Sequence, residues 1–331
     1  MRPLLHPSLV NGRWGDPALY VETLFERGAM LLDLGDIAAL PPRKVLRLER
    51  VFVSHAHIDH FIGFDRLLRL LVGREKTISL YGPADFVAQV HHKLSAYRWN
   101  LVDRYECDLV FLVTEIDSSL KRRTVRFRLK AGFAGEEIGR GTAVDGVLHS
   151  EAGYRVSTAI LEHRTPCLAF AIEEAAHVNV WKNRLAELGL PVGAWLHELK
   201  RAVVEERPDD HPIRIAAPSF ESRELPLAAL RHVVTITPGQ KIGYVTDAAD
   251  TAGNRAAIIA LVRNADLLFI EAVFAQADAA LAAERAHLTT KAAGEIARAA
   301  GVRAPEPFHF SPRYAGEEAR MLDEVTAAFG D

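Results

Sequence analysis

The segment VFVSHAHIDHFIGF, residues 51–64, places four polar side chains directly after an apolar run. They are His55, His57, Asp59 and His60. Polar groups at the end of a buried strand need partners, because an unpaired polar group away from water costs ~1–3 kcal/mol. A metal ion, or a pair of metal ions, would supply such partners.

The spacing of these residues also suits metal binding. In an extended segment His55 and His57 point to the same side, because successive side chains of a strand alternate between its faces. Both imidazoles can then bind one ion, and a following turn directs Asp59 and His60 toward a neighbouring position. Imidazole together with carboxylate suits zinc and similar borderline ions. A lone histidine is more often a core residue, but so dense a set favours metal ligation.

Four ligands cannot complete two metal sites, so further ligands must come from distant parts of the chain. Functional residues of α/β proteins gather at the carboxyl ends of strands, which indicates where to search. His163 stands between two apolar segments in TAILEHRTPCLAF, Asp247 ends the run KIGYVT, and His309 follows a short segment in PEPFHFSPRY. We expect a strand to deliver each of them to the same edge.

Short apolar runs predict the buried strands that position these residues, and they alternate with helical patterns. The predicted strands are 29–35, 50–54, 77–82, 108–113, 167–172, 241–247 and 266–272. The predicted helices are 61–71, 83–94, 253–263, 289–300 and 314–329. The alternation indicates the α/β class.

Two further segments have their own patterns. Residues 124–130, TVRFRLK, alternate strictly and predict a half-buried strand with a basic outer face. That face either contacts phosphates or forms a solvated edge that deters aggregation. Residues 174–236 interrupt the alternation of predicted strands and helices with clustered charges and prolines. We interpret them as an inserted arm-like segment with helical character.

The composition narrows the class of protein. Hydrophobic residues make up 49% and charged residues 25%, as in an ordinary globular protein, and the net charge of −3 gives no support for a strongly basic nucleic-acid binder. Only Cys107 and Cys167 are present, which argues against a disulfide framework and suits a reducing cytosol. Neither a signal-peptide pattern nor a membrane-span-length apolar run occurs. We therefore expect a cytoplasmic protein without membrane contact.

The motif SHAHIDH resembles the defining motif of the metallo-β-lactamase superfamily. The finer pattern is similar to the ribonuclease Z (tRNA 3′-endonuclease) branch. The matching segments, in that branch's order, are LEHRTPCLAFAIEE, GLPVGAWLHELK, YVTDAAD, IEAVF, HLTTKAAGEIARAAGV and FHFSPRY. The resemblance implies the metallo-β-lactamase fold, a four-layer αβ/βα sandwich with two mixed sheets facing each other and helices outside. It implies one metallo-hydrolase domain over residues 1–331, with 174–236 inserted in it.

The resemblance also implies two divalent metal ions per chain, zinc first and manganese as the alternative. The implied ligands are His55, His57 and His163 for one ion and Asp59, His60 and His309 for the other, with Asp247 bridging both. The implied catalytic residues are Asp59, His287 and Glu271. Glu271 would orient His287, and Asp33 would support the ligands from behind.

In function, the resemblance implies a phosphodiesterase in which metal-bound hydroxide attacks RNA at the 3′ end of a precursor tRNA. It also implies a homodimer. The arm signature departs from the branch, however, because Pro-Gly-Pro is replaced by Pro191-Val192-Gly193-Ala194. The alternative is a superfamily hydrolase of another ester, a lactone, a thioester or a small cyclic phosphodiester. A third interpretation, a non-catalytic binding module, conflicts with the complete ligand set.

Overall fold

The computed structural model describes residues 4–24, 28–218 and 220–330, which form two compact units. The main unit comprises the described residues of Met1–Glu173 and Gln240–Asp331. The insert comprises those of Glu174–Gly239, three residues beyond the predicted segment 174–236. Its interpretation as an arm within a single metallo-hydrolase domain stays a prediction.

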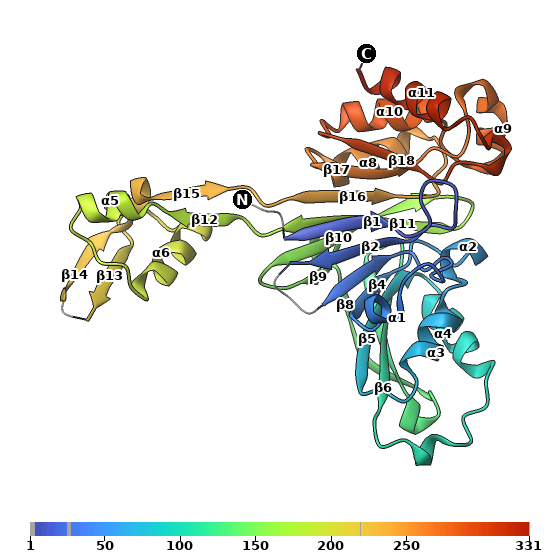
Figure 1. Cartoon of the computed structure of the whole chain (residues 1–331), viewed down its shortest axis with the longest axis horizontal. Helices are drawn as coiled ribbons and strands as arrows, with labels where there is room; N and C mark the ends of the chain where they lie inside the picture. Colours follow the sequence, from blue (N-terminus) through green and yellow to red (C-terminus); the bar gives the residue numbers. More distant parts are fainter. Residues whose placement is uncertain (1–3, 25–27, 219, 331) are drawn as a thin grey trace. The chain divides into compact units, whose positions relative to one another are not determined.

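The first sheet of the main unit has the strand order β1-β2-β3-β4-β5-β6-β7-β8 within the described ranges (Figure 1). Its strands are β1 (Leu5–Leu9), β2 (Leu19–Thr23), β3 (Ala29–Leu32), β4 (Leu48–Phe52), β5 (Lys76–Pro83), β6 (Leu109–Ile116), β7 (Lys121–Arg128) and β8 (Gly135–Thr142). Neighbours from β3 to β6 are parallel, and the outer pairs are antiparallel. The sheet is therefore mixed.

The second sheet of the main unit has the order β18-β17-β16-β11-β10-β9. Its strands are β9 (Val147–Ser150), β10 (Tyr154–Glu162), β11 (Pro166–Glu174), β16 (Lys241–Val245), β17 (Leu267–Glu271) and β18 (Pro305–Phe308). The pairs β16–β17 and β17–β18 are parallel, whereas β11–β16 and β9–β10 are antiparallel. The second sheet is also mixed, as predicted.

The two sheets face each other across a shared apolar core. Phe52 from the first sheet lies in one buried cluster with Phe170, Tyr244 and Phe308 from the second. The α-helices described in the main unit are α1 (Pro42–Val45), α2 (Ile58–Phe61), α3 (Phe64–Leu71), α4 (Phe86–Ser95), α8 (Ala252–Val262), α9 (Ala279–Arg285), α10 (Thr290–Ala299) and α11 (Glu318–Gly330). Separate clusters pack α3 and α4 on the first sheet and α8, α10 and α11 on the second (Figure 1). The predicted four-layer sandwich is confirmed.

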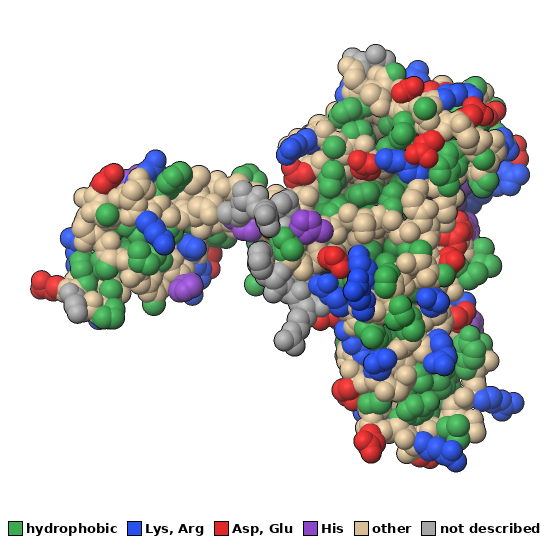
Figure 2. Space-filling model, in the orientation of Figure 1, with side chains coloured by type: hydrophobic (Ala, Val, Ile, Leu, Met, Phe, Trp, Pro, Cys, Tyr) green, Lys and Arg blue, Asp and Glu red, His purple; other side chains and the backbone are tan. Residues whose placement is uncertain are grey.

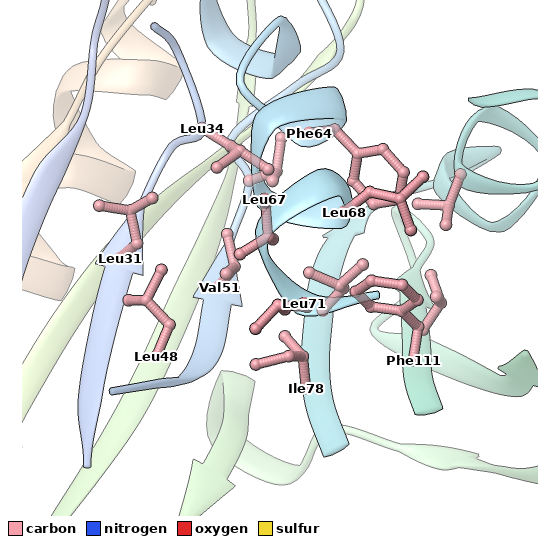
Figure 3. Packing of buried hydrophobic residues seen from close by; sticks show 14 of the residues in the cluster. Leu31, Leu34, Leu48, Val51, Phe64, Leu67, Leu68, Leu71, Ile78 and Phe111 are labelled. Carbon is pink, nitrogen blue, oxygen red and sulfur yellow. The ribbon is translucent and has the colours of Figure 1, made fainter. Parts of the chain in front are cut away.

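Helix α3 illustrates how the sequence pattern produces this packing. Phe64, Leu67, Leu68 and Leu71 recur at the spacing of one helical face, and all four are buried. Figure 3 shows them directed at the strands that carry Val51, Ile78 and Phe111. Burying each such side chain stabilises the fold by about 1.5–3 kcal/mol, which holds α3 in place directly after the histidine motif.

The insert contains strands as well as helices. Its elements are β12 (His177–Val180), α5 (Lys182–Glu187), α6 (Trp195–Val204), β13 (Pro212–Ala217), β14 (Phe220–Pro226), α7 (Leu227–Leu230) and β15 (Val234–Thr237). β12 pairs with β15 and β13 with β14, around a core of its own that includes Trp195, Leu199 and Ile213. The helical character was predicted, but the strand pairs were not, because the strands are short: β12 and β15 have only four residues each.

The insert carries both signs of charge. Its sequence from 174 to 239 has eight Lys or Arg and nine Asp or Glu residues. Figure 2 shows red, blue and green side chains interspersed on its visible face. The insert therefore has no net positive charge with which to attract a polyanion over a distance.

The basic strand predicted at 124–130 overlaps β7 (Lys121–Arg128), and Leu129–Ala131 form a 3-10 turn after it. β7 is not an edge strand, so the interpretation as a solvated edge is wrong. β7 pairs with β6 on one side and β8 on the other. Arg126 forms an ion pair with Glu136 of β8 at 2.7 Å, and Arg128 pairs with Asp108 at 2.7 Å. These two arginines are thus paired with carboxylates, which disfavours the phosphate-binding interpretation. The third basic residue of the pattern, Lys130, donates a hydrogen bond from its Nζ to the backbone carbonyl of Glu106. In the described ranges, no helix is both long and apolar enough to cross a lipid bilayer.

Candidate metal centre and active site

Polar side chains gather where strands of both sheets end. They are Asp33 after β3, His55 after β4, His163 after β10, Asp247 after β16, Glu271 at the end of β17 and His309 after β18. Asp33 and His309 adopt left-handed backbone conformations, with φ of 57° and 61°. Such conformations are strained for non-glycine residues, and strain of this kind is common at functional sites.

The histidine motif is folded as a loop followed by a single helical turn. After β4 the chain is irregular through His57, and the one-turn helix α2 carries Asp59 and His60. The amide of Leu34 donates a hydrogen bond to the His60 carbonyl at 2.9 Å, which ties the β3 loop to this helix. A Cβ atom on Gly63 would lie 2.1 Å from the carbonyl oxygen of Gly35, so this close approach requires glycine.

The structure brings all seven predicted metal ligands together in two groups. Within each group the candidate ligand atoms lie within 4.8 Å of one another. The groups are His55, His57, His163 and Asp247, and Asp59, His60 and His309. Each mixes imidazole nitrogen with carboxylate oxygen, the donor set that zinc prefers among oxygen and nitrogen ligands.

Asp247 contacts both groups through its two carboxylate oxygens. Its Oδ2 lies 3.5 Å from His55 Nε2, 3.3 Å from His163 Nε2 and 3.5 Å from His60 Nε2. Its Oδ1 lies 2.9 Å from His309 Nδ1. A carboxylate in this position can bind two cations at once, and the bridging role of Asp247 stays a prediction.

Three buried histidine ring nitrogens show whether these residues suit metal ions. In the part of the chain that the structure describes, His55 Nε2, His60 Nε2 and His309 Nδ1 are buried and form no well-aligned hydrogen bond. Leaving such atoms without a partner costs about 1–3 kcal/mol each. All three face Asp247, where a cation would bind them. The residues therefore fit metal ions.

Burial and neighbouring charges keep part of the ligand set in the protonation states that bind a cation. Burial is the main effect that lowers the pKa of His55, to about 2, and burial also lowers the pKa of His57. Both imidazoles are therefore neutral, the form that binds metals. Burial raises the pKa of Asp247, but the imidazoles of His60 and His309 outweigh that effect and hold this pKa well below its usual value. The Asp247 carboxylate is therefore ionised.

Asp33 supports the ligands from behind the site. Its Oδ1 accepts a hydrogen bond from the Ser54 amide at 2.6 Å. Its Oδ2 accepts hydrogen bonds from the Ser54 hydroxyl at 2.9 Å, the Tyr244 hydroxyl at 3.0 Å and His60 Nδ1 at 2.9 Å. The bond to His60 Nδ1 leaves Nε2 to face the metal site and sets the orientation of the ring.

We expect Asp33→Asn to weaken metal binding while the protein stays folded. The Asp33 carboxylate now accepts hydrogen bonds from several donors, including His60 Nδ1. An amide has one oxygen fewer to accept them and would turn its own N–H groups toward these donors, so the His60 ring would lose its orientation. Loss of such support typically lowers metal affinity by ~10–100-fold. Zinc titration against a competing chelator measures the change, with Asp65→Asn, a surface carboxylate paired with Lys93, as the control. An unchanged affinity would show that Asp33 does not orient the ligand.

His287 and Glu271 form a pair beside the ligands. His287 follows α9, whose last turn ends at Ala286 in a left-handed conformation, and Thr289 caps the start of α10 by accepting a hydrogen bond from Ala292 N. The Glu271 carboxylate is fully buried, accepts the Ala248 amide at 2.6 Å and lies 3.0 Å from His287 Nδ1.

The Glu271 oxygens are both engaged by protein donors, although Glu271 also lies near Asp247 and His309. We therefore interpret it as a partner of His287 and not as a metal ligand. Burial lowers the pKa of His287, but the Glu271 carboxylate outweighs burial and raises this pKa. His287 can therefore carry a proton near neutral pH, and its Nδ1 lies 3.9 Å from Asp247 Oδ1.

These residues open onto a cavity of about 770 Å³. The ligands and His287 that line it are His57, Asp59, His163, Asp247, His287 and His309. Trp14, Phe274, Arg164, Arg285 and Arg313 also line it. The cavity thus gives a substrate access to the metal ligands and to His287 at the same time.

Sequence reasoning missed several residues of this site. Ser54 precedes the histidine motif directly, and its position before the first ligand was the available signal. Tyr244 reads as an ordinary core residue, because its partner Asp33 is 211 residues away. Cys167 is buried with its Sγ 3.7 Å from His55 Nδ1, a contact that its sequence position does not show. Arg164 directly follows the predicted ligand His163, and that position was its available signal.

Comparisons with known proteins give the following similarities. The chain is 30% identical over 333 residues to Ribonuclease Z of Deinococcus radiodurans, covering 98% of this chain and 96% of that protein. The structure resembles human tRNase Z, short form, with a TM-score of 0.53, 16% identity and coverage of 93% of this chain and 91% of the other. It also resembles the metallo-beta-lactamase fold protein YhfI of Bacillus subtilis, with a TM-score of 0.54, 16% identity and coverage of 97% and 92%. No protein-family model matches the chain.

Proposed function

The chain belongs to the ribonuclease Z family, and from this premise we propose that it hydrolyses an RNA phosphodiester at the 3′ end of precursor tRNA. It is a metal-dependent hydrolase of the phosphodiesterase class. One observation supports the proposal above all others: two ligand groups sharing Asp247 open onto the same cavity as the His287–Glu271 pair. A phosphodiester with a poor leaving group needs both charge neutralisation and a proton donor, and this cavity offers both.

We propose that His55, His57 and His163 hold one metal ion, that Asp59, His60 and His309 hold a second, and that Asp247 binds both. When bound, divalent cations lower the pKa of water and offset the negative charge that develops on a phosphodiester under attack. Asp59 is ionised, because the nearby imidazoles of His309 and His60 outweigh the effect of burial and lower its pKa. Its side chain is 38% exposed and lines the cavity, so Asp59 faces the substrate.

His287 supplies the proton for the leaving 3′-oxygen in this proposal. Glu271 accepts the Nδ1–H of His287, which leaves Nε2 as the nitrogen that can donate a proton. The Glu271 carboxylate raises the pKa of His287 and so favours the protonated form of this imidazole. The buried bond from the Ala248 amide holds Glu271 in turn, so the orientation of the acid is set by the backbone.

Metal content gives a direct prediction. We expect about two ions per chain, zinc before manganese, because seven ligand side chains form two groups around Asp247. Elemental analysis of protein purified without chelator measures the content. A value near zero that stays unchanged after reconstitution with zinc or manganese would contradict the proposed metal sites.

A substrate panel tests the proposed reaction. Purified protein is assayed with precursor tRNA, bis-p-nitrophenyl phosphate, a lactone and a β-lactam, each with and without chelator. We expect cleavage of precursor tRNA at its 3′ end, abolished by chelator. The mixed charge of the insert favours a second candidate, hydrolysis of a small ester or cyclic phosphodiester, because such a substrate needs no polyanion-binding surface. Faster hydrolysis of the lactone than of RNA would establish that candidate instead.

Two further properties implied by the family resemblance stay predictions. We propose that the protein forms a homodimer, which light scattering coupled to size-exclusion chromatography measures. We also propose a cytosolic location, consistent with the use of only two cysteines and with the buried state of Cys167. A monomer at micromolar concentration would contradict the first of these predictions.

A further inference from the structure

Two arginines at the active-site cavity lack the carboxylate partners that neutralise other arginines of this chain. Arg164 and Arg313 both line the cavity that contains the metal ligands. Among the ion pairs of the described residues, neither guanidinium is paired with a carboxylate. Arg126 and Arg128 of β7, by contrast, each lie 2.7 Å from an acidic side chain. The charges of Arg164 and Arg313 are therefore not cancelled by an ion pair, unlike those of Arg126 and Arg128.

Each of these arginines is nevertheless held in place by an uncharged group. The Arg164 guanidinium donates a hydrogen bond to the backbone carbonyl of Glu284. The Arg313 guanidinium lies over the ring of Phe274, 5.4 Å from its centroid. A carbonyl and an aromatic ring orient a guanidinium without cancelling its charge. Both side chains are thus oriented before any ligand arrives.

The backbone conformation of Arg164 is a second indication that its side chain has a function. Arg164 lies in the three-residue turn between β10 and β11, directly after the candidate ligand His163. Its φ of 54° falls in the left-handed region, where glycine is favoured over a side chain as long as arginine. A strained non-glycine residue beside an active site suggests that its side chain serves a function.

We propose that Arg164 and Arg313 bind backbone phosphates of the nucleotides that flank the scissile bond. The guanidinium fork matches phosphate geometry and forms charge-assisted hydrogen bonds. This proposal rests on the proposed function and deepens it, because it makes the substrate a single-stranded oligonucleotide and not an isolated phosphodiester. It also places the recognition of polyanion charge at the cavity, while the insert carries mixed charge.

The test uses inhibition of the metal-loaded enzyme by a short RNA. Bis-p-nitrophenyl phosphate, which has one phosphate and no flanking nucleotide, serves as the substrate, and tetrauridylate serves as the inhibitor. We expect Arg164→Ala and Arg313→Ala each to weaken tetrauridylate inhibition by ~10-fold. The dependence of log Ki on log salt, from about 50 to about 200 mM, should become shallower by ~0.7 for each arginine removed. Arg313→Lys should keep the salt slope but lose affinity, because lysine retains the charge without the fork.

Arg126→Ala serves as the matched control, because this half-buried arginine is already paired with Glu136. It should leave both the inhibition constant and its salt slope unchanged. Salt slopes of the Arg164 and Arg313 variants equal to that of wild type would overturn the proposal. Equal losses of bis-p-nitrophenyl phosphate hydrolysis and tetrauridylate inhibition would overturn it too, since they would place the arginines at the reacting phosphate.

The outcome can be separated from failure of the proposed function. A wild-type enzyme that hydrolyses bis-p-nitrophenyl phosphate but leaves precursor tRNA intact would contradict the tRNA-processing proposal alone. The tetrauridylate measurement would still decide whether Arg164 and Arg313 bind flanking phosphates. If precursor tRNA is cleaved, the same variants should raise KM for it while kcat changes less.

Discussion

Asp247→Ala is expected to abolish phosphodiester hydrolysis and to weaken metal binding at both sites together. The reason is that one carboxylate reaches both ligand groups, with Oδ2 3.5 Å from His55 Nε2 and Oδ1 2.9 Å from His309 Nδ1. Loss of a single charge-stabilising group in an active site lowers kcat by ~10²–10³-fold, and loss of two cations should lower it further. Elemental analysis and hydrolysis of precursor tRNA measure the two effects on the same preparation.

Two further variants separate this role from a general loss of structure. Asp247→Asn keeps the shape of the side chain but removes its charge, so it should lose activity and metal like the alanine variant. Asp323→Ala, which removes an exposed carboxylate of α11, should retain both. Circular dichroism checks that each variant is folded. Loss of one ion with retained activity would show that Asp247 does not bridge the two sites.

His287→Ala is expected to leave metal content intact and to affect substrates according to their leaving groups. If His287 protonates the leaving 3′-oxygen, RNA cleavage should slow by ~10²–10⁴-fold, the usual contribution of general acid catalysis. A nitrophenolate barely needs a proton, so hydrolysis of bis-p-nitrophenyl phosphate should be much less affected. The ratio of the two losses in kcat is the quantity to measure.

The matched variants for this prediction are Glu271→Gln and His92→Ala. Glu271→Gln removes the carboxylate that raises the pKa of His287, so RNA cleavage should fall while metal content is retained. His92 is an exposed histidine of α4, and its removal should leave both substrates unaffected. Equal losses on both substrates would assign His287 a binding or structural role. No loss on either would make it an ordinary residue before α10.

The features that sequence alone predicted are those that depend on local spacing. The strand ahead of the histidine motif and the helix after it are visible as a short apolar run and as the periodicity of Phe64, Leu67, Leu68 and Leu71. The candidate ligands could be proposed because strand ends converge at one edge of an α/β protein, so a polar residue after an apolar run has a predictable location. The family resemblance added the pairing of ligands and the role of His287.

The tertiary structure decided which side chains support those residues and which charges remain uncompensated. Tyr244 donates to Asp33 across 211 residues of sequence, and no local pattern marks either residue as the partner of the other. The sequence near neither Arg126 nor Arg313 shows its partner, but Glu136 of the adjacent strand neutralises Arg126, whereas Arg313 rests on the ring of Phe274. Hydrophobic periodicity predicts which face of a helix or strand a side chain occupies. The partner of that side chain belongs to the segment that packs against this face, and only long-range folding brings the two segments together.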